Sequence, residues 1–174
     1  RYVLALLRLL VVVAEPRDEY LSGVLTLPAF PLSAADVWRV MQYAKKERKP
    51  AVEVLRSLED LTHAKVNSPE NAIALGTLIE ELAREASIER PAVVAEHALI
   101  RSGILKALLG SPDRAEGLGA VRSLLSLFED LVRREHTAQL PRALELVTLY
   151  EEREMNLSGR VFSDETRVKI MTVH

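Results

Sequence analysis

The sequence predicts an all-α fold: an irregular multi-helix domain of about eight helices, with one strand left over at its C-terminal end. Apolar residues make up 48% of the 174 residues and charged residues 28%, a balance typical of folded domains and not of disordered chains. Only seven residues are glycine, and the helix formers Leu, Ala, Glu and Arg dominate. One stretch repeats apolar residues in steps of three and four, which places them on one helical face. These residues are Leu118, Val121, Leu124, Leu125, Phe128, Leu131 and Val132.

Proline, glycine and capping residues set the boundaries of the expected helices. Ser33 stands three residues before Asp36, an arrangement similar to a capping box. Ser68 and Ser111 are each followed by a proline and then an acidic residue, a pattern that opens helices. Gly103 is expected to separate a helix from a short turn that ends at Gly110. The expected helices cover residues 2–14, 17–27, 34–47, 50–62, 68–86, 91–101, a segment that follows 111–113, and 141–155.

Residues 167–173 mix apolar with polar side chains and are rich in β-branched residues, which predicts a strand. No other strand is expected in the chain to pair with it. We therefore expect its sheet partners to lie in another part of a longer protein, and the start at Arg1 instead of Met agrees with this expectation. In the isolated chain, residues 167–174 should be disordered, docked loosely or paired with another copy, because an unpaired strand edge recruits neighbours.

The sequence predicts no catalytic or metal site. The chain has no cysteine, which excludes disulfides, cysteine-based zinc sites and thiol catalysis. None of the four histidines has a second histidine at metal-ligand spacing, and His97 is expected to be a surface or partly buried polar residue. The glycines between Gly110 and Gly117 are not followed by Lys-Ser or Lys-Thr, as a phosphate-binding loop requires. We therefore expect no catalytic residue, no metal ligand and no cofactor in this segment.

Two further patterns are expected to be structural. Residues 3–14 are apolar except for Arg8, but about 12 residues are too few to span a bilayer, which takes about 20. We expect a buried helix there and no membrane partner. Acidic residues gather at 80–81, 129–130 and 151–154, beside Arg or Lys on expected helices. These groups are expected to be solvated helix faces with local ion pairs.

The densest group of basic residues, called the basic cluster below, consists of Lys45, Lys46, Arg48 and Lys49. The formal net charge is −2 (23 basic minus 25 acidic residues), so any contact with DNA needs a local patch of this kind. The cluster ends an expected helix, where cations also stabilise the helix dipole, so a purely structural interpretation stays open beside phosphate binding. Trp38 and Tyr43 precede the cluster and could stack on bases, although Trp38 is expected to pack in the core.

Both ends of the chain carry motifs of one family. Residues 167–174 (RVKIMTVH) closely resemble the opening of helicase motif V in the UvrD/Rep/RecB family of superfamily 1 DNA helicases. The first part of the chain resembles the start of the family's 2B subdomain, a helical insertion in the second RecA-like domain. The residues that carry this resemblance are 4–10 (LALLRLL), Asp18, Val24, Leu25, 28–30 (PAF), Leu32, Ser33 and Asp36. The resemblance implies two parts: residues 1–166 as a 2B-like subdomain, and residues 167–174 as the first strand of motif V in the RecA-like 2A domain.

The resemblance also implies a function. The 2B subdomain of this family contacts duplex DNA near a single-strand junction and regulates unwinding, whereas ATP and Mg²⁺ are used by the RecA-like domains of the parent helicase. Through motif V, Thr172 and His174 would contribute to single-strand DNA contact and to the ATP-linked site. Further partners would be the RecA-like domains of the same polypeptide and accessory repair or recombination proteins, in the cytoplasm at the nucleoid. Pro31 and Ser33 stand where UvrD-like members have the glycines of a helix–hairpin–helix turn, so the UvrD/Rep and RecB/AddA branches both stay open.

Two other functional interpretations remain beside the helicase subdomain. The first is a helical protein–protein interaction domain unrelated to DNA. The second is a stand-alone enzyme, for which the sequence offers no site. In the helicase interpretation, the basic cluster, Thr172 and His174 are the expected DNA-binding residues.

Overall fold

The computed structural model describes residues 1–152, and it places α-helices and no strand among them. The prediction of an all-α fold is therefore confirmed for this part of the chain. The expected strand at 167–173 lies outside the described residues, together with the motif V positions Thr172 and His174.

Ten helices make up the described part of the chain. They are α1 (Tyr2–Ala14), α2 (Asp18–Leu21), α3 (Ala34–Glu47), α4 (Ala51–Arg56), α5 (Leu58–His63), α6 (Pro69–Ala86), α7 (Pro91–Arg101), α8 (Ile104–Leu109), α9 (Arg114–Arg134) and α10 (Leu140–Glu152).

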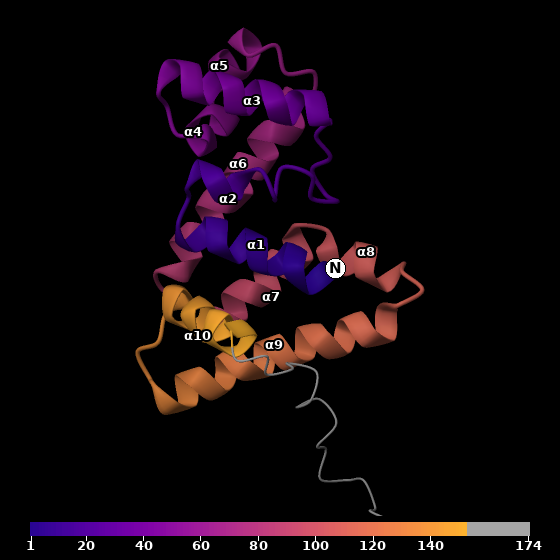
Figure 1. The fold of residues 1–174 in the computed structure, drawn as a ribbon, viewed down its shortest axis with the longest axis vertical. Coiled ribbons are helices and arrows are strands. Elements are labelled where there is room, and N and C mark those ends of the chain that lie inside the picture. Colours follow the sequence, from indigo (N-terminus) through magenta and orange to yellow (C-terminus); the bar gives the residue numbers. More distant parts are fainter. Residues whose placement is uncertain (153–174) are drawn as a thin grey trace, which may run out of the picture.

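The described helices form an elongated body with α6 along much of its length (Figure 1). Helices α3, α4 and α5 gather at one end around the first part of α6. Helix α1 lies in the middle and packs against α6, α7 and α10, while α9 and α10 close the other end. Helix α3, whose C-terminal end carries the basic cluster, thus lies at the end of the molecule opposite α9.

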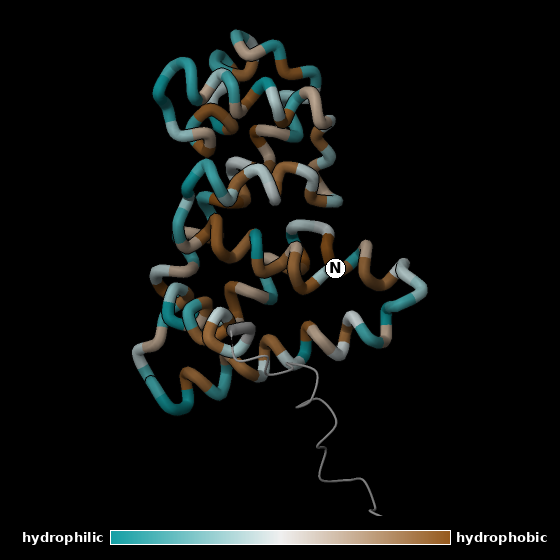
Figure 2. Tube along the Cα trace, viewed as in Figure 1, coloured by the Kyte–Doolittle hydropathy of each residue, from teal (hydrophilic) through white to brown (hydrophobic). Residues whose placement is uncertain are grey.

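Helix α1 is the central apolar element of this body. Figure 2 shows it mostly in the colour of hydrophobic residues, whereas many of the connecting turns are hydrophilic. Leu6, Leu9 and Leu10 are each 0% exposed, because α1 is covered from several sides. The expectation of a buried helix over 3–14 is confirmed. None of the helices within residues 1–152 combines the length and the apolar character needed to cross a membrane.

Several predicted boundaries are confirmed. The hydroxyl of Ser33 accepts a hydrogen bond from the Asp36 N–H at 3.1 Å, which caps α3 as expected. Prolines occupy the first turns of α6 and α7, and Gly103 separates α7 from α8. The Ser68 side chain, however, makes no capping bond, and α9 begins at Arg114, after the turn that Ser111 stabilises.

Three predicted elements are wrong in extent. The helix expected over 17–27 is only α2, followed by turns, because Gly23 weakens the helix and buried contacts hold the segment instead. The helix expected over 50–62 is divided into α4 and α5 by Ser57, which has an extended backbone and accepts a hydrogen bond from the Asp60 N–H at 3.1 Å. The turn expected after Gly103 is the short helix α8.

Candidate nucleic-acid interface

Helix α3, which carries most of the basic cluster, is fixed at its N-terminal end by a buried carboxylate. Asp36 is 1% exposed. Its Oδ1 accepts hydrogen bonds from the Arg39 guanidinium at 3.0 Å and from the Asn67 N–H at 2.8 Å. Burial alone would raise the pKa of this carboxyl, but the hydrogen bonds from Asn67, Ser33 and Arg39 outweigh it and hold the pKa below its ordinary value. The start of α3 is thereby tied to the segment that leads into α6.

A second carboxylate fixes the other end of α3. The Lys49 ammonium lies 2.8 Å from Oδ1 and 2.9 Å from Oδ2 of Asp60, at the start of α5. The Tyr43 hydroxyl donates to the same Oδ1 at 3.0 Å. The hydrogen bond from Lys49 lowers the pKa of Asp60, and the same bond raises the pKa of Lys49. The pKa of the Tyr43 hydroxyl is raised by burial and by its bond to Asp60.

The bonds of Lys49 and Tyr43 to Asp60 reduce the number of cluster residues that are available to bind a phosphate. The charge of Lys49 is already balanced by Asp60, so Lys49 serves first to hold the end of α3. The Tyr43 ring packs partly against the core, and its hydroxyl donates to Asp60. We therefore assign Tyr43 a structural role and not a role in stacking on bases. No sequence signal indicates the pairing of Lys49 with Asp60, because Lys49 lies in the connection after α3 and Asp60 lies in α5, and only the fold brings them together.

The other three members of the basic cluster point into water. Lys45 and Lys46 occupy the last turn of α3, and Arg48 ends the helix in the left-handed conformation with φ 55°. All three are exposed. Lys46 pairs with its neighbour Glu47 at 3.2 Å on the surface, whereas Lys45 and Arg48 form no ion pair with any residue in 1–152. A phosphate group could therefore approach this helix end without first displacing a buried partner.

Trp38 is 64% exposed, so the prediction that it packs in the core is wrong. Successive residues of a helix are turned by about 100°, and the buried residues of α3 are Asp36, Val40 and Ala44. Position 38 lies on the opposite side of the helix from position 40 and is turned away from the core. Hydrophobicity alone predicts a buried tryptophan. Which face of α3 is buried is set by the polar bonds at its two ends, those of Asp36 and of Asp60.

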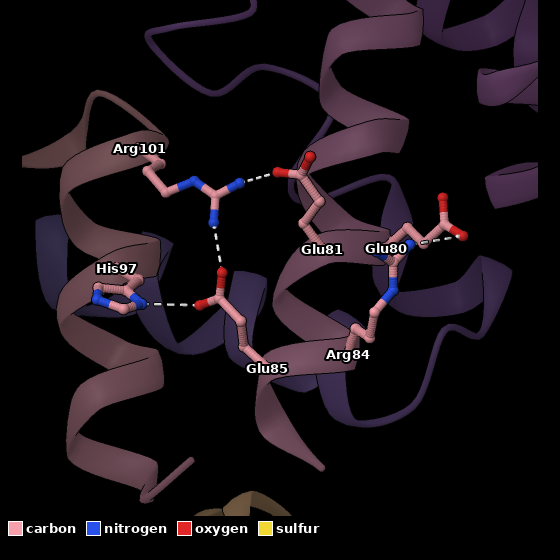
Figure 3. A network of polar contacts seen from close by, with 6 residues as sticks. All are labelled: Glu80, Glu81, Arg84, Glu85, His97 and Arg101. Atoms are coloured by element: carbon pink, nitrogen blue, oxygen red, sulfur yellow. Dashed lines mark hydrogen bonds and ion pairs between the residues drawn. The ribbon is translucent and has the colours of Figure 1, made fainter. Parts of the chain in front are cut away.

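A separate polar network joins α6 to α7 (Figure 3). The Arg101 guanidinium donates to Glu85 at 2.8 Å and also to Glu81, and Nδ1 of His97 lies 2.7 Å from Glu85 Oε2. The contact with His97 is the largest cause that lowers the pKa of Glu85. The two acids stand four residues apart on α6, and their two partners stand four residues apart on α7.

This network corrects one prediction. Glu80 and Glu81 were expected on a solvated face with local pairs, but both also link separate helices. Glu81 binds Arg101 of α7, and Glu80 lies 2.7 Å from Arg56 of α4 and 3.3 Å from Arg84 of its own helix. The sequence signal for the link between α6 and α7 is an equal spacing: Glu81 and Glu85 stand four residues apart, as do His97 and Arg101. Among the described residues, no three His, Asp or Glu side chains gather as they would around a metal ion.

A groove of about 510 Å³ lies between α1, α2 and α10. Its walls are largely apolar, with Leu4 and Val11 from α1 and Val147 from α10. Arg8 and Glu19 add one charge of each sign. The sequence did not indicate this groove, because it is formed by segments more than one hundred residues apart.

Comparisons with models of protein families, with curated proteins and with solved structures give no match for this chain. The resemblance to UvrD/Rep/RecB helicases therefore rests on the motifs at the two ends of the sequence. Within residues 1–152, the C-terminal end of α3 carries three exposed cations, Lys45, Lys46 and Arg48.

Proposed function

We propose that this chain is a regulatory helical subdomain of a UvrD/Rep/RecB-like DNA helicase, which contacts duplex DNA and modulates unwinding without catalysis of its own. The proposal is supported by the resemblance of both chain ends to that family. The single structural observation that carries it is the group of exposed cations Lys45, Lys46 and Arg48 at the fixed end of α3. ATP and Mg²⁺ would act in the RecA-like domains of the parent protein.

The geometry favours phosphate contacts because the cations are held on a rigid support. The bonds to Asp36 and Asp60 fix the two ends of α3, so the helix does not have to become ordered on binding. The overall charge of −2 gives no long-range attraction to DNA. We therefore expect weak binding that depends strongly on salt, as is typical when a few phosphate contacts supply most of the affinity.

The salt dependence of binding to a blunt DNA duplex tests this proposal. Three phosphate contacts predict a log–log slope of about −2.7, at about −0.9 per contact. The triple variant Lys45→Ala, Lys46→Ala, Arg48→Ala should lose most of the affinity and flatten the slope toward zero. Fluorescence anisotropy of labelled duplex, measured between about 50 and 200 mM salt, gives both quantities.

A matched control removes the same charge from the other end of the molecule. Lys106, Arg114 and Arg122 on α8 and α9 are exposed and form no ion pair with any described residue. Replacing these three with Ala should leave the slope within error of the original. If the control variant loses as much affinity as the cluster variant, binding reflects net charge alone and the α3 site is wrong.

The groove between α1, α2 and α10 favours a second candidate, a helical protein-interaction domain unrelated to DNA. Absence of duplex binding even at about 50 mM salt would favour this second function. The neighbouring coding sequence separates the two candidates independently. A phosphate-binding lysine motif upstream and a Lys-Gly-Leu-Glu continuation downstream are expected only for the helicase.

A further inference from the structure

The exposed face of α3 offers more than cations. Trp38 is 64% exposed on a helix whose ends are both fixed by buried or half-buried polar bonds. We infer that Trp38 is a stacking site for an unpaired DNA base next to a duplex, with Lys45 holding the adjoining phosphates. This inference rests on the proposed function, and it names the DNA structure that the site would select.

The position of Trp38 keeps one side of its ring free. Side chains on a helix lean toward its N-terminal end, so Trp38 lies over the turn that contains Ala34 and Ala35. Both alanines are exposed and short, and they do not shield the ring. Within residues 1–152, Trp38 has no ring or cation partner. A flat group can therefore approach the indole from solvent.

The polar neighbours of Trp38 match the chemistry of a nucleotide. Gln42, four residues further along the same face, is exposed and offers an amide that can donate and accept at the edge of a base. Lys45, seven residues from Trp38, is turned by only about 20° from it and lies about 10 Å along the helix axis. This separation corresponds to about three base-pair rises along the axis of a B-form duplex.

An aromatic ring aligned with cations is the usual arrangement for binding unpaired strands, since the ring stacks on bases and the cations hold the backbone. Inside a duplex both faces of every internal base are already stacked. A terminal base pair presents one free face, whereas an unpaired base at a frayed end or a junction can be stacked on both. Lys45 is the cation aligned with the ring. Lys46 is turned by about 80° from Trp38 around the helix, and Arg48 ends the helix in the left-handed conformation, so these two flank Lys45 and can take phosphates of the paired region. The site therefore favours a duplex with a single-stranded tail over a blunt one.

Trp38 is the only tryptophan of the chain, so its fluorescence reports this site directly. The intact chain is titrated with a blunt duplex, with the same duplex carrying a short thymidine tail, and with a duplex whose tail is abasic. The thymidine tail should quench the emission and tighten binding about tenfold, as expected for one stacked base. The abasic tail carries the same phosphates without bases, so it should not quench the emission and should tighten binding much less.

Two variants complete the test, read by anisotropy of labelled DNA. Trp38→Ala should abolish the preference for the thymidine tail and leave the salt slope on blunt duplex unchanged, whereas Trp38→Phe should keep part of the preference. Ile88→Ala, at an 81% exposed position outside the proposed site, should change nothing. Equal binding of blunt and tailed duplex with a salt slope of about −2.7 would overturn the stacking site alone. Failure to bind any of the three DNAs would overturn the proposed function as well.

Discussion

Gly103 lies directly against the backbone of Ala29. A Cβ atom at position 103 would come within 2.9 Å of the Ala29 nitrogen and 3.0 Å of its Cβ. The Ala29 N–H donates to the carbonyl oxygen of Ser102 at 3.1 Å, so the connection between α2 and α3 is joined here to the turn between α7 and α8. The φ angle of Gly103 is +75°, a left-handed conformation that side chains with a Cβ rarely adopt.

Replacing Gly103 with Ala should therefore destabilise the protein by about 1–2 kcal/mol or more, from backbone strain and from the clash with Ala29. Urea unfolding followed by circular dichroism measures the change. Gly110→Ala is the matched control, because its φ of −80° is ordinary and the nearest atoms would lie 3.7 Å away. The control should be neutral or stabilising by up to about 1 kcal/mol. Equal effects of the two substitutions would show that the left-handed turn is unimportant.

The apolar stripe of α9 should contribute heavily to stability. Phe128 is 0% exposed, and Phe128→Ala should lower the free energy of unfolding by about 3–5 kcal/mol, since it removes a buried ring and leaves a cavity. Leu118→Ala on the same helix, at a position 37% exposed, should cost much less, about 0.5–1 kcal/mol. Denaturant midpoints at constant slope give both numbers. A larger loss at Leu118 than at Phe128 would contradict the placement of α9.

The link between α6 and α7 should depend on the branched guanidinium group of Arg101, which has several N–H donors. Its guanidinium reaches both Glu81 and Glu85, which an ammonium group cannot do with the same geometry. Because the three side chains are partly exposed, we expect Arg101→Ala to cost only about 1 kcal/mol, with Arg101→Lys intermediate. Arg84→Ala, which removes one surface pair with Glu80, should change the unfolding free energy by less than about 0.5 kcal/mol. If Arg101→Lys matches the original protein, the forked geometry has no role.

The anchor between Lys49 and Asp60 predicts a pH dependence. The pKa of Asp60 is lowered from 3.8, so its contribution is present above about pH 4 and is lost as pH falls through the lowered value. The pKa of Lys49 is raised from 10.5, so its contribution is complete below that pH and is lost as pH rises through the raised value.

The stability difference between the original protein and Lys49→Met should accordingly be constant from about pH 5 to about pH 9. It should shrink on the acidic side, where Asp60 becomes protonated, and on the alkaline side, where Lys49 loses its charge. Urea unfolding at a series of pH values measures it. Lys65→Met, at an exposed lysine without an ion pair in the described residues, is the control, and its stability difference should stay the same across the whole pH series. For Lys49→Met, a difference that is the same at every pH would falsify the anchor.

Elements governed by local chemistry could be predicted from the sequence. The hydroxyl of Ser33 reaches the N–H three residues later by geometry that no distant residue alters, and this start of α3 was predicted correctly. The break at Gly103 and the long helix α9 also depend on residues close together in the sequence, and both were predicted. The division of the 50–62 helix was missed because Ser57 can continue a helix or cap a new one, and the packing of α4 and α5 on α6 decides between the two.

The candidate site shows the same limit. The sequence located the basic cluster, and its place at the end of α3 follows from the helix period. The sequence did not indicate that Lys49 forms an ion pair with Asp60, nor that Trp38 is exposed to water. Both outcomes depend on which face of α3 is buried, and that face is selected by partners that lie 11 to 31 residues away along the chain.

By itself, then, the sequence determined the helical class, most helix starts and the position of the charged helix end, because each depends on residues within one or two turns of one another. Only the tertiary structure decided which cations remain free, where the aromatic ring points, and how α6 and α7 are bound together by Glu81, Glu85 and Arg101. The physical reason is that an ion pair or a buried face needs two surfaces to meet, and the relative placement of two helices is not encoded in the period of either one.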